Sequence, residues 1–312
     1  MKALVTGGAG FIGSNLVSTL LREGHEVVVL DDLSSGHLCN LEPLGVRPIV
    51  GDVRDAAAVD AAVAGCEVVF HLAASVGNKR SIDFPLEDAS VNVMGTLQVL
   101  EAARRHGVRK VVFSSSAGIF GELKTLPISE GHPVEPDTPY GSTKLGAEKL
   151  CLSYAKLYDL ECVCLRYFNI YGPGQRFDAY GNVIPIFVVR SLAGEGITIF
   201  GDGEQTRDFC HVRDVVQAKV RAAMSRGVSG AFNIGSGTRV SINALVELLR
   251  ASGLELSARY GPPRAGDVRD SLADIRAAQD RLGFAPREEL SAGLREYVQW
   301  ARTQPMDLRR GG

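Results

Sequence analysis

The sequence predicts an α/β fold: a doubly wound parallel sheet with a smaller α/β lobe interleaved with it. Short β-branched runs alternate with amphipathic helical stretches through the first half of the chain, which is typical of a parallel sheet covered on both faces. Right-handed crossovers between such units give a doubly wound sheet. After about residue 166, turns rich in Gly and Pro separate shorter elements. We expect this second part to form the smaller lobe.

Six strands are predicted in the first half of the chain. Each is a short, mostly apolar run bounded by polar residues or glycine. The runs cover residues 2–5, 26–30, 47–50, 68–72, 110–114 and 161–166. Their largely apolar character predicts strands that are buried on both faces of the sheet.

Helices are predicted between these strands. Residues 11–23 place leucines at helical spacing on one face. Asp55 is a candidate N-cap for the next helix, and Gly65 is a candidate end for it. Two longer stretches, 88–106 and 140–158, also carry apolar residues at helical spacing. Together these helices supply the crossovers that a parallel sheet requires.

The second half divides less sharply. A helix is predicted from Ser241 onward, where apolar residues become periodic again. Segments near 211–235 have the pattern of a helix and a strand that return to the main sheet. We therefore expect a first domain of residues 1–166, with the returning segments near 211–235, and a second lobe of residues 167–312.

Composition excludes several classes of function. The chain has 312 residues, 45% of them hydrophobic, and a net charge of −2, so it has no overall field to attract nucleic acid or an anionic membrane. No apolar run approaches the ~20 residues that span a bilayer, and the first residues lack the pattern of a signal peptide. The histidines and cysteines show no metal-ligand spacing. We expect a cytoplasmic protein without a metal.

The loop after the first predicted strand has the pattern of a dinucleotide site. In the string GGAGFIG, Gly7 permits a tight turn, Gly10 lets the backbone approach a pyrophosphate, and Gly13 permits close packing of helix on strand. The N-terminus of the following helix offers unpaired N–H groups to phosphates. The context of strand, loop and helix is that of a Rossmann unit.

Acidic residues at the ends of the next two strands indicate which dinucleotide binds. Asp31 and Asp32 end the second strand, where a carboxylate accepts hydrogen bonds from ribose hydroxyls. A carboxylate there repels a 2′-phosphate, so NAD is favoured over NADP. Asp52, at the end of the third strand, is placed to meet the adenine amine or to cap the turn that follows, and both are compatible.

Tyr140 and Lys144 lie four residues apart in a predicted helix, on one face. A free tyrosine titrates near pH ~10, so making Tyr140 a base near neutrality requires roughly 4 kcal/mol of preference for the phenolate. A neighbouring ammonium and the positive ring of an oxidised nicotinamide are the expected sources of that energy. The pair therefore indicates hydride chemistry on an alcohol.

Six motifs occur in an order that resembles a known family. They are the glycine loop from Gly7 to Gly13, the acidic turn from Asp31 to Gly36, His71-Leu-Ala-Ala74, Ser114-Ser-Ser116, the Tyr140/Lys144 pair, and the string from Arg166 to Gly174. Together they resemble the extended short-chain dehydrogenase/reductase superfamily, in its NAD-dependent epimerase/dehydratase branch, and most of all the UDP-sugar 4-epimerases. The resemblance covers residues 1 to about 300.

The resemblance implies roles for these residues. Ser116 would bond the 4-hydroxyl of the sugar, Tyr140 would be the base, and Lys144 would hold the nicotinamide ribose. The implied cofactor contacts are Gly7, Gly10, Phe11, Ile12, Gly13, Asp31, Asp32, Ser35, Gly36, Asp52, Val53, Leu72, Ala73, Ala74, Asn92, Ser114, Tyr140, Lys144 and Tyr167. The implied substrate contacts are Ser116, Gly118, Tyr140, Asn169, Arg176, Asn182, Val183, Thr198, Phe200, Arg207, Arg264 and Asp267. Guanidinium groups in the second set suit a diphosphate.

The residues after Ser116 indicate which reaction follows oxidation at C4. Family members that eliminate water or epimerise next to the ketone carry acids or a cysteine there, whereas this chain has Ala117 and Gly118. Neither side chain can move a proton, so abstraction of a C–H proton lacks its acid or base. Oxidation and re-reduction at one carbon remain, which is 4-epimerisation. A net keto-sugar dehydrogenase or reductase, and a silent NAD-binding scaffold, are the alternatives.

The sugar and the assembly are less determined. Arg176 matches an arginine that UDP-glucuronate 4-epimerases place near the sugar carboxylate, and the small Ser271 is compatible with an N-acetyl group. UDP-glucuronate, UDP-glucose and UDP-N-acetylglucosamine all stay open, with the first two favoured. The family resemblance further implies a homodimer through helices 88–106 and 140–158.

Overall fold

A seven-stranded parallel sheet forms the centre of the computed structural model, which describes residues 1–175, 182–263 and 268–304. Its strand order is β11-β6-β5-β4-β1-β2-β3, and every neighbouring pair is parallel. The strands are β1 (Lys2–Thr6), β2 (Glu26–Asp31), β3 (Ile49–Val50), β4 (Val68–His71), β5 (Lys110–Ser116), β6 (Glu161–Tyr167) and β11 (Gly230–Ile234). The order reverses on either side of β1, so the predicted doubly wound sheet is confirmed.

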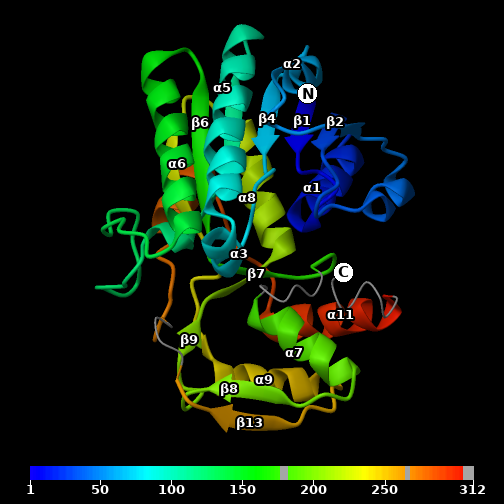
Figure 1. Ribbon diagram of the computed structural model, residues 1–312, viewed down its shortest axis with the longest axis vertical. Helices are drawn as coiled ribbons and strands as arrows, with labels where there is room; N and C mark the ends of the chain where they lie inside the picture. The colour runs from blue at the N-terminus through cyan, green and yellow to red at the C-terminus, as the bar shows by residue number, and fades with distance from the viewer. Residues whose placement is uncertain (176–181, 264–267, 305–312) are drawn as a thin grey trace.

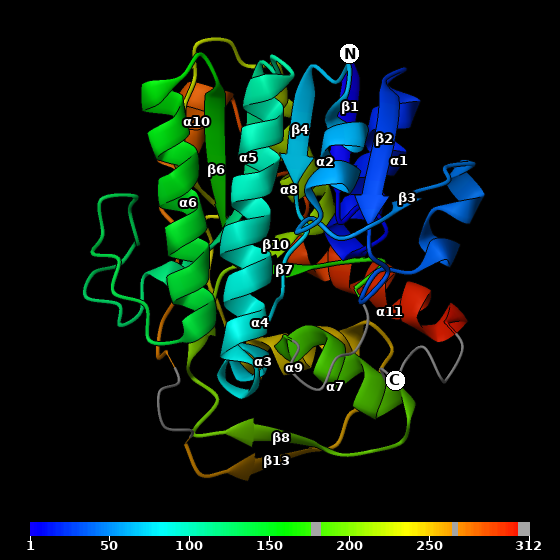
Figure 2. The ribbon, with the colours of Figure 1, turned by 45° about the horizontal axis from the view of Figure 1, so that its top comes forward.

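Helices cover both faces of this sheet (Figures 1 and 2). One face carries α1 (Phe11–Arg22) and α8 (Val212–Met224), and the other carries α2 (Ala56–Val63), α5 (Thr96–Arg105) and α6 (Pro139–Leu157). The predicted N-cap of α2 is confirmed, because the Asp55 carboxylate accepts from the backbone N–H groups of Ala57 and Ala58. The returning helix and strand near 211–235 are confirmed as α8 and β11.

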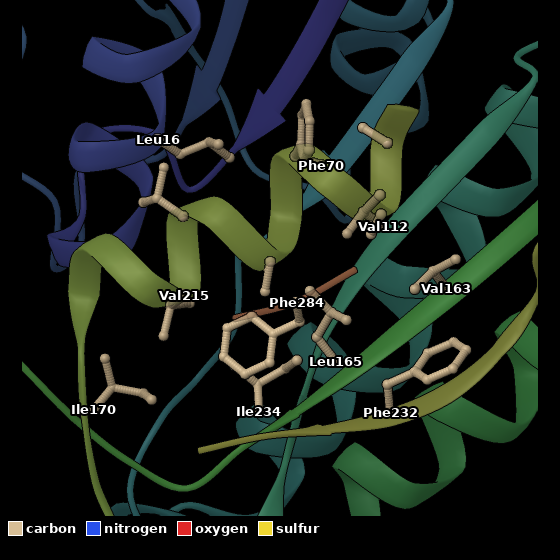
Figure 3. Close-up of a cluster of buried hydrophobic side chains, with 14 of the residues drawn as sticks. Leu16, Phe70, Val112, Val163, Leu165, Ile170, Val215, Phe232, Ile234 and Phe284 are labelled. Carbon is tan, nitrogen blue, oxygen red and sulfur yellow. The ribbon is translucent and has the colours of Figure 1, made fainter. Parts of the chain in front are cut away.

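The face under α1 and α8 is a continuous apolar core. Figure 3 shows Leu16 and Val215 of these helices in one cluster with Phe70, Val112 and Val163 of the central strands. All five side chains are buried. Because α8 belongs to the second half of the chain, this core joins the two halves.

Two predicted boundaries are wrong. The expected strand 47–50 is only Ile49–Val50, because Pro48 has no N–H to donate to the ladder. The expected helix 88–106 is three segments: α4 (Pro85–Ala89), a wider π-helical turn η3 (Ser90–Gly95), and α5. The wide turn accompanies tertiary contacts, since Asn92 bonds to the backbone of Ser75.

The smaller lobe lies beyond the carboxyl ends of the central strands (Figures 1 and 2). It contains α7 (Val183–Leu192), α9 (Ile242–Ala251), α11 (Leu290–Thr303) and the paired strands β8 (Ile197–Phe200) and β13 (Ala258–Gly261). Two further pairs, β7 (Asn169–Tyr171) with β10 (Phe209–His211) and β9 (Thr206–Arg207) with β12 (Val240–Ser241), connect it to the sheet. The predicted helix after Ser241 is α9, and Ser241 caps it.

Within the described part of the chain, no helix is long and apolar enough to cross a membrane. The same residues contain no group of three or more histidine, cysteine or acidic side chains arranged to hold a metal ion.

Candidate active site

The glycine-rich loop leaves the start of α1 open to an anion. Gly10 is the N-cap of α1 and provides no side-chain cap, so the first-turn N–H groups are available to phosphate oxygens. An ideal Cβ on Gly13 would lie 2.1 Å from the Gly7 carbonyl oxygen, so only glycine allows the helix this close. Phe11 and Ile12 follow in the first turn of α1. The residues present fit the pyrophosphate of a dinucleotide.

Asp31 is built into this loop. Its carboxylate accepts from the Ala9 backbone N–H at 2.8 Å and from the Leu33 N–H at 2.9 Å, and burial raises its pKa. Gly36 packs on it, since a Cβ there would lie 2.9 Å from Asp31 Oδ1. Asp32 instead is exposed and accepts from the N–H and hydroxyl of Ser34. The structure therefore gives the two acids different surroundings, and only Asp31 is held against the loop.

Asp52 caps the turn that follows it. Its carboxylate accepts from the backbone N–H and the guanidinium of Arg54, and this hydrogen bond lowers the pKa of Asp52. The sequence left two roles open for Asp52, a contact with the adenine amine and a cap for the turn, and the structure shows the cap. Next to it, Val53 is buried against Gly95 of η3.

The segment after β4 is fixed by hydrogen bonds to side chains. Thr6 Oγ1 accepts from the backbone N–H groups of Leu72 and Ala73. Two residues beyond Ala73, the Asn92 amide bonds to both the N–H and the carbonyl of Ser75. Leu72 to Ala74 therefore form a rigid edge beside the glycine loop.

His71, at the end of β4, is buried between two threonines. Its Nδ1 lies 2.8 Å from Thr6 Oγ1 and its Nε2 lies 3.0 Å from Thr96 Oγ1. Burial, with smaller contributions from Lys144 and Lys219, lowers the pKa of His71 to about 3. The imidazole is therefore a neutral hydrogen-bonding bridge at neutral pH.

Ser116, Tyr140 and Lys144 come from two neighbouring elements, the end of β5 and the first turns of α6. A hydrogen bond joins Tyr140 to Ser116. Lys144 is buried, with its ammonium 4.8 Å from the ring centroid of Phe113. Burial lowers the pKa of Lys144 to about 8, while Asp88 opposes that shift.

The expected depression of the tyrosine pKa is not a property of the chain by itself. Burial raises the pKa of Tyr140 to about 12; the hydrogen bond from Ser116 lowers it only in part, and Asp88 raises it further. The Lys144 ammonium lies over Phe113 and is not among the groups that shift Tyr140. The protein groups around Tyr140 therefore do not, taken together, favour its phenolate form.

Two charged contacts that the sequence analysis missed hold α6 in place. Both oxygens of Glu148, which is two turns beyond Tyr140, are engaged: Arg166 donates at 2.7 and 3.0 Å, and Ser115 donates at 2.7 Å. Thr143 donates to Asp88 on α4. Glu148 continues the four-residue spacing of Tyr140 and Lys144, a signal that was present in the sequence.

Gly118 lies directly beside Ser116 and Tyr140 and carries no side chain there. An ideal Cβ on Gly118 would lie 3.3 Å from Ser116 Oγ and 3.8 Å from the ring of Tyr140. Any side chain at this position would therefore stand over the tyrosine. In other branches of the family that the sequence resembles, this position carries a side chain that can move a proton. Here the position adjoins Tyr140 and has no such side chain.

Several expected cofactor contacts lie on the opposite face of the sheet from α6. Ser114 Oγ is 3.3 Å from the hydroxyl of Tyr167. Lys219 of α8 donates to Ser114 at 2.9 Å, and this lysine was not identified from the sequence. Ser35 is exposed in the turn after β2.

Apart from Ser116, Gly118 and Tyr140, the expected substrate contacts that the structure describes lie in the smaller lobe or at its junction with the sheet. Asn169 begins β7 and donates to the Asp208 carbonyl, and Arg207 lies in β9, donating to the Thr206 carbonyl at 2.8 Å. Asn182 and Val183 start α7, and Thr198 and Phe200 lie on β8. Arg176, Arg264 and Asp267 lie outside the described residues.

A doubly wound sheet with a glycine loop, an acid at the end of β2 and a Tyr/Lys pair beside Ser116 defines a nicotinamide-dependent enzyme that acts on an alcohol. The family model described as NAD dependent epimerase/dehydratase family matches residues 3–235. The chain belongs to this family, and NAD is its cofactor.

Relatives of this chain cover it almost completely. It is 43% identical to a UDP-glucose 4-epimerase of Mycolicibacterium smegmatis, over 97% of this chain and 99% of the relative. A solved structure of UDP-N-acetylglucosamine 4-epimerase from Methanobrevibacter ruminantium M1, in complex with UDP-N-acetylmuramic acid, matches with a TM-score of 0.93 and 35% identity. A structure of MoeE5 with UDP-glucuronic acid and NAD matches with a TM-score of 0.87 and 39% identity. Each structural match covers 97% of this chain and 99% of the other.

Replacing Glu148 with alanine should destabilise the protein by about 4 kcal/mol, because Arg166 would stay buried without its partner. Urea unfolding followed by circular dichroism measures this change. Glu135→Ala is the control, since it removes the partner of Lys124 in an exposed ion pair, where the expected change is small. Equal effects of the two substitutions would contradict the structural role of Glu148.

His71 should make stability depend on pH in the acid range. Its folded pKa of about 3 lies below the ordinary 6.5, so its contribution is complete above 6.5 and is lost as pH falls toward 3. At a pH of about 4 the loss amounts to about 3 kcal/mol. Wild type should therefore lose more stability than His71→Gln between neutral pH and that point. Parallel pH profiles of the two proteins would contradict this expectation.

Proposed function

We propose that this protein is an NAD-dependent UDP-sugar 4-epimerase. The observation that carries the proposal is the pairing of Tyr140 and Ser116 beside the empty position of Gly118. The pair can take a proton from a hydroxyl group and return it, and neither Ala117 nor Gly118, which follow Ser116, can remove a proton from carbon. Relatives that bear the names of UDP-sugar 4-epimerases support the same reaction.

The reaction uses the same residues in both directions. Ser116 bonds the 4-hydroxyl of the sugar and orients it toward Tyr140, which accepts the hydroxyl proton. When bound, NAD would supply first the hydride acceptor and then the hydride donor. Lys144 holds the nicotinamide ribose. After the sugar has turned, Tyr140 returns its proton to the oxygen at C4, and the stereochemistry there has been inverted.

The two parts of the chain divide this work. Residues 1–166, with the returning segments near 211–235, bind NAD, and residues 167–312 bind the UDP-sugar. Arg207 and Arg264 hold the diphosphate, Arg176 lies near the sugar, and Asp267 meets the nucleotide ribose. The diphosphate is the pivot about which the sugar turns, so Arg207 and Arg264 must bind it in both sugar orientations.

The sugar is UDP-glucose, UDP-glucuronate or UDP-N-acetylglucosamine, with the first two preferred. Relatives named for, or solved with, each of these sugar types leave the choice to experiment. Ser271 is small and buried beside Thr206, to whose carbonyl its N–H donates. The cytoplasmic location expected from the sequence stays a prediction.

The assembly is a homodimer that packs through the α4–η3–α5 segment and α6. Met94 of η3 and Leu157 of α6 are apolar but are 52% and 70% exposed. Apolar side chains on two neighbouring helices form the kind of surface that a two-fold contact buries.

Incubation with each of the three UDP-sugars, without added reductant, should yield the C4 epimer of at least one, read by NMR. Tyr140→Phe should lower kcat about a thousandfold, because it removes the acid/base group. Tyr158→Phe is the matched control, since this exposed tyrosine at the end of α6 should be dispensable. Accumulation of a 4-keto-6-deoxy sugar or a pentose, or net consumption of NAD as in a dehydrogenase, would overturn the assignment. NAD binding without any turnover would favour the silent scaffold.

Gly118→Glu should lower epimerase activity by more than about tenfold, because the new side chain would occupy the space beside Tyr140 in which the sugar must present either face. Turnover of the preferred UDP-sugar measures the loss, and Gly131→Ala in an open loop is the control. Full activity of Gly118→Glu would contradict the proposed role of the empty position.

Light scattering should give the mass of a dimer. Met94→Glu should shift the protein toward monomer, because it would bury a charge in the contact. Met224→Glu replaces an equally exposed methionine at the end of α8, outside the proposed interface, and should leave the dimer intact. A monomeric wild type would remove the dimer proposal without affecting the epimerase proposal.

A further inference from the structure

Lys219 is a fully buried lysine in the middle of α8. Its ammonium donates to Ser114 Oγ at 2.9 Å and lies 5.6 Å from the ring centroid of Tyr167. Ser114 in turn lies 3.3 Å from the Tyr167 hydroxyl. One lysine from the second half of the chain therefore contacts the end of β5, the strand that carries Ser116, and the end of β6.

The charge of Lys219 is not balanced by an acid. Within the described ranges, no carboxylate lies within ion-pair distance of it, and its pKa is lowered by burial and by the charge of Lys144. Lys110 is a contrasting case: it is equally buried but lies 2.8 Å from Glu161 Oε2 and donates to three oxygens of Ala222 and Ser225. Burying an unpaired lysine costs stability, so packing does not explain the choice of lysine at 219.

The surroundings of Lys219 belong to the proposed cofactor pocket. Ser114 and Tyr167 are proposed contacts of NAD, and the inference that follows rests on that placement. Lys144 is buried across the sheet on α6, and both lysines disfavour protonation of His71, which lies at the end of β4. Positive charge therefore converges from both faces on the carboxyl ends of β4 and β5.

Charge near a nicotinamide ring favours one redox state over the other. The ring is positive in NAD+ and neutral in NADH, so a nearby ammonium repels the oxidised form and leaves the reduced form unaffected to first order. Burial strengthens the effect, because the effective dielectric constant falls in the interior. Through linkage, the preference appears as tighter binding of NADH relative to NAD+.

We propose that Lys219 is a positioning residue of the nicotinamide pocket that acts through Ser114 and Tyr167, and that in its protonated form its charge makes bound NAD+ a stronger hydride acceptor. In the reaction, a hydride leaves C4 of the sugar for the nicotinamide and the hydroxyl proton goes to Tyr140. Lys219 gains and loses no bond. It shifts the balance toward the 4-keto stage, which must persist long enough for the sugar to turn.

The test measures the preference for the two cofactor forms directly. Purified holoenzyme is exchanged against an equimolar mixture of NAD+ and NADH at slightly acidic pH, and the bound ratio is determined from nicotinamide absorbance. Lys219→Met and Lys219→Gln should each shift the bound ratio toward NAD+ on the order of tenfold. Lys219→Arg, which keeps the charge, should leave the ratio near that of wild type.

Controls separate charge from structure. Lys110→Met also removes a buried lysine but lies at the other end of β5, so it should not change the ratio. An unchanged ratio in both neutral variants would overturn the proposal. A shift in Lys219→Met alone would also overturn it, because Lys219→Gln keeps a donor to Ser114 but lacks the charge, so the shift would then come from the lost hydrogen bond. If Lys219→Met does not fold, the comparison of glutamine with arginine decides. No UDP-sugar is present, so this result is independent of the substrate assignment.

Discussion

The buried ion pair between Glu148 and Arg166 is the contact on which the catalytic geometry depends. Glu148 lies on the same face of α6 as Tyr140 and Lys144, and its carboxylate binds Arg166 of β6 together with Ser115, the neighbour of Ser116. A buried carboxylate keeps its charge only where its oxygens are satisfied, and here that requires one register of α6 against β5 and β6. The distance between the base and the serine is therefore set by an interaction two helical turns away.

A second constraint is electrostatic. The site gathers buried lysines from both faces of the sheet, and it raises the pKa of Tyr140 rather than lowering it. The protein by itself thus keeps the Tyr140 phenol protonated, and in the proposed mechanism the cationic ring of NAD+ is the group that favours the phenolate. Coupling of this kind joins cofactor redox state to proton transfer, because the charge that stabilises the phenolate disappears when the ring is reduced.

Local sequence patterns predicted the helices and strands well. The features that the sequence did not predict are mostly contacts between segments that lie far apart in the chain. The strand runs, the cap at Asp55 and the acid at Asp31 follow from short stretches whose physics is local. Lys219 gave no signal, since a lysine in an amphipathic helix is ordinarily solvent-exposed. The π-helical turn at Ser90–Gly95 was also missed, because its helical period differs little from that of an α-helix in sequence. Arg54 beside Asp52 was visible in the sequence, yet the pairing depends on the turn geometry.

The sequence by itself determined the fold class and the cofactor loop, and it singled out the pair proposed to react, because each depends on residue types at fixed local spacing. It also determined that no proton-moving side chain follows Ser116, which separates epimerisation from elimination. Tertiary structure decided how these parts act. Folding buries Lys144 and Lys219 and half-buries Tyr140 at the carboxyl ends of the central strands, and the resulting desolvation shifts their proton affinities. The desolvation of a residue depends on what packs against it. Here the helix α8 covers one face of the sheet, and it lies more than a hundred residues farther along the chain than the glycine loop.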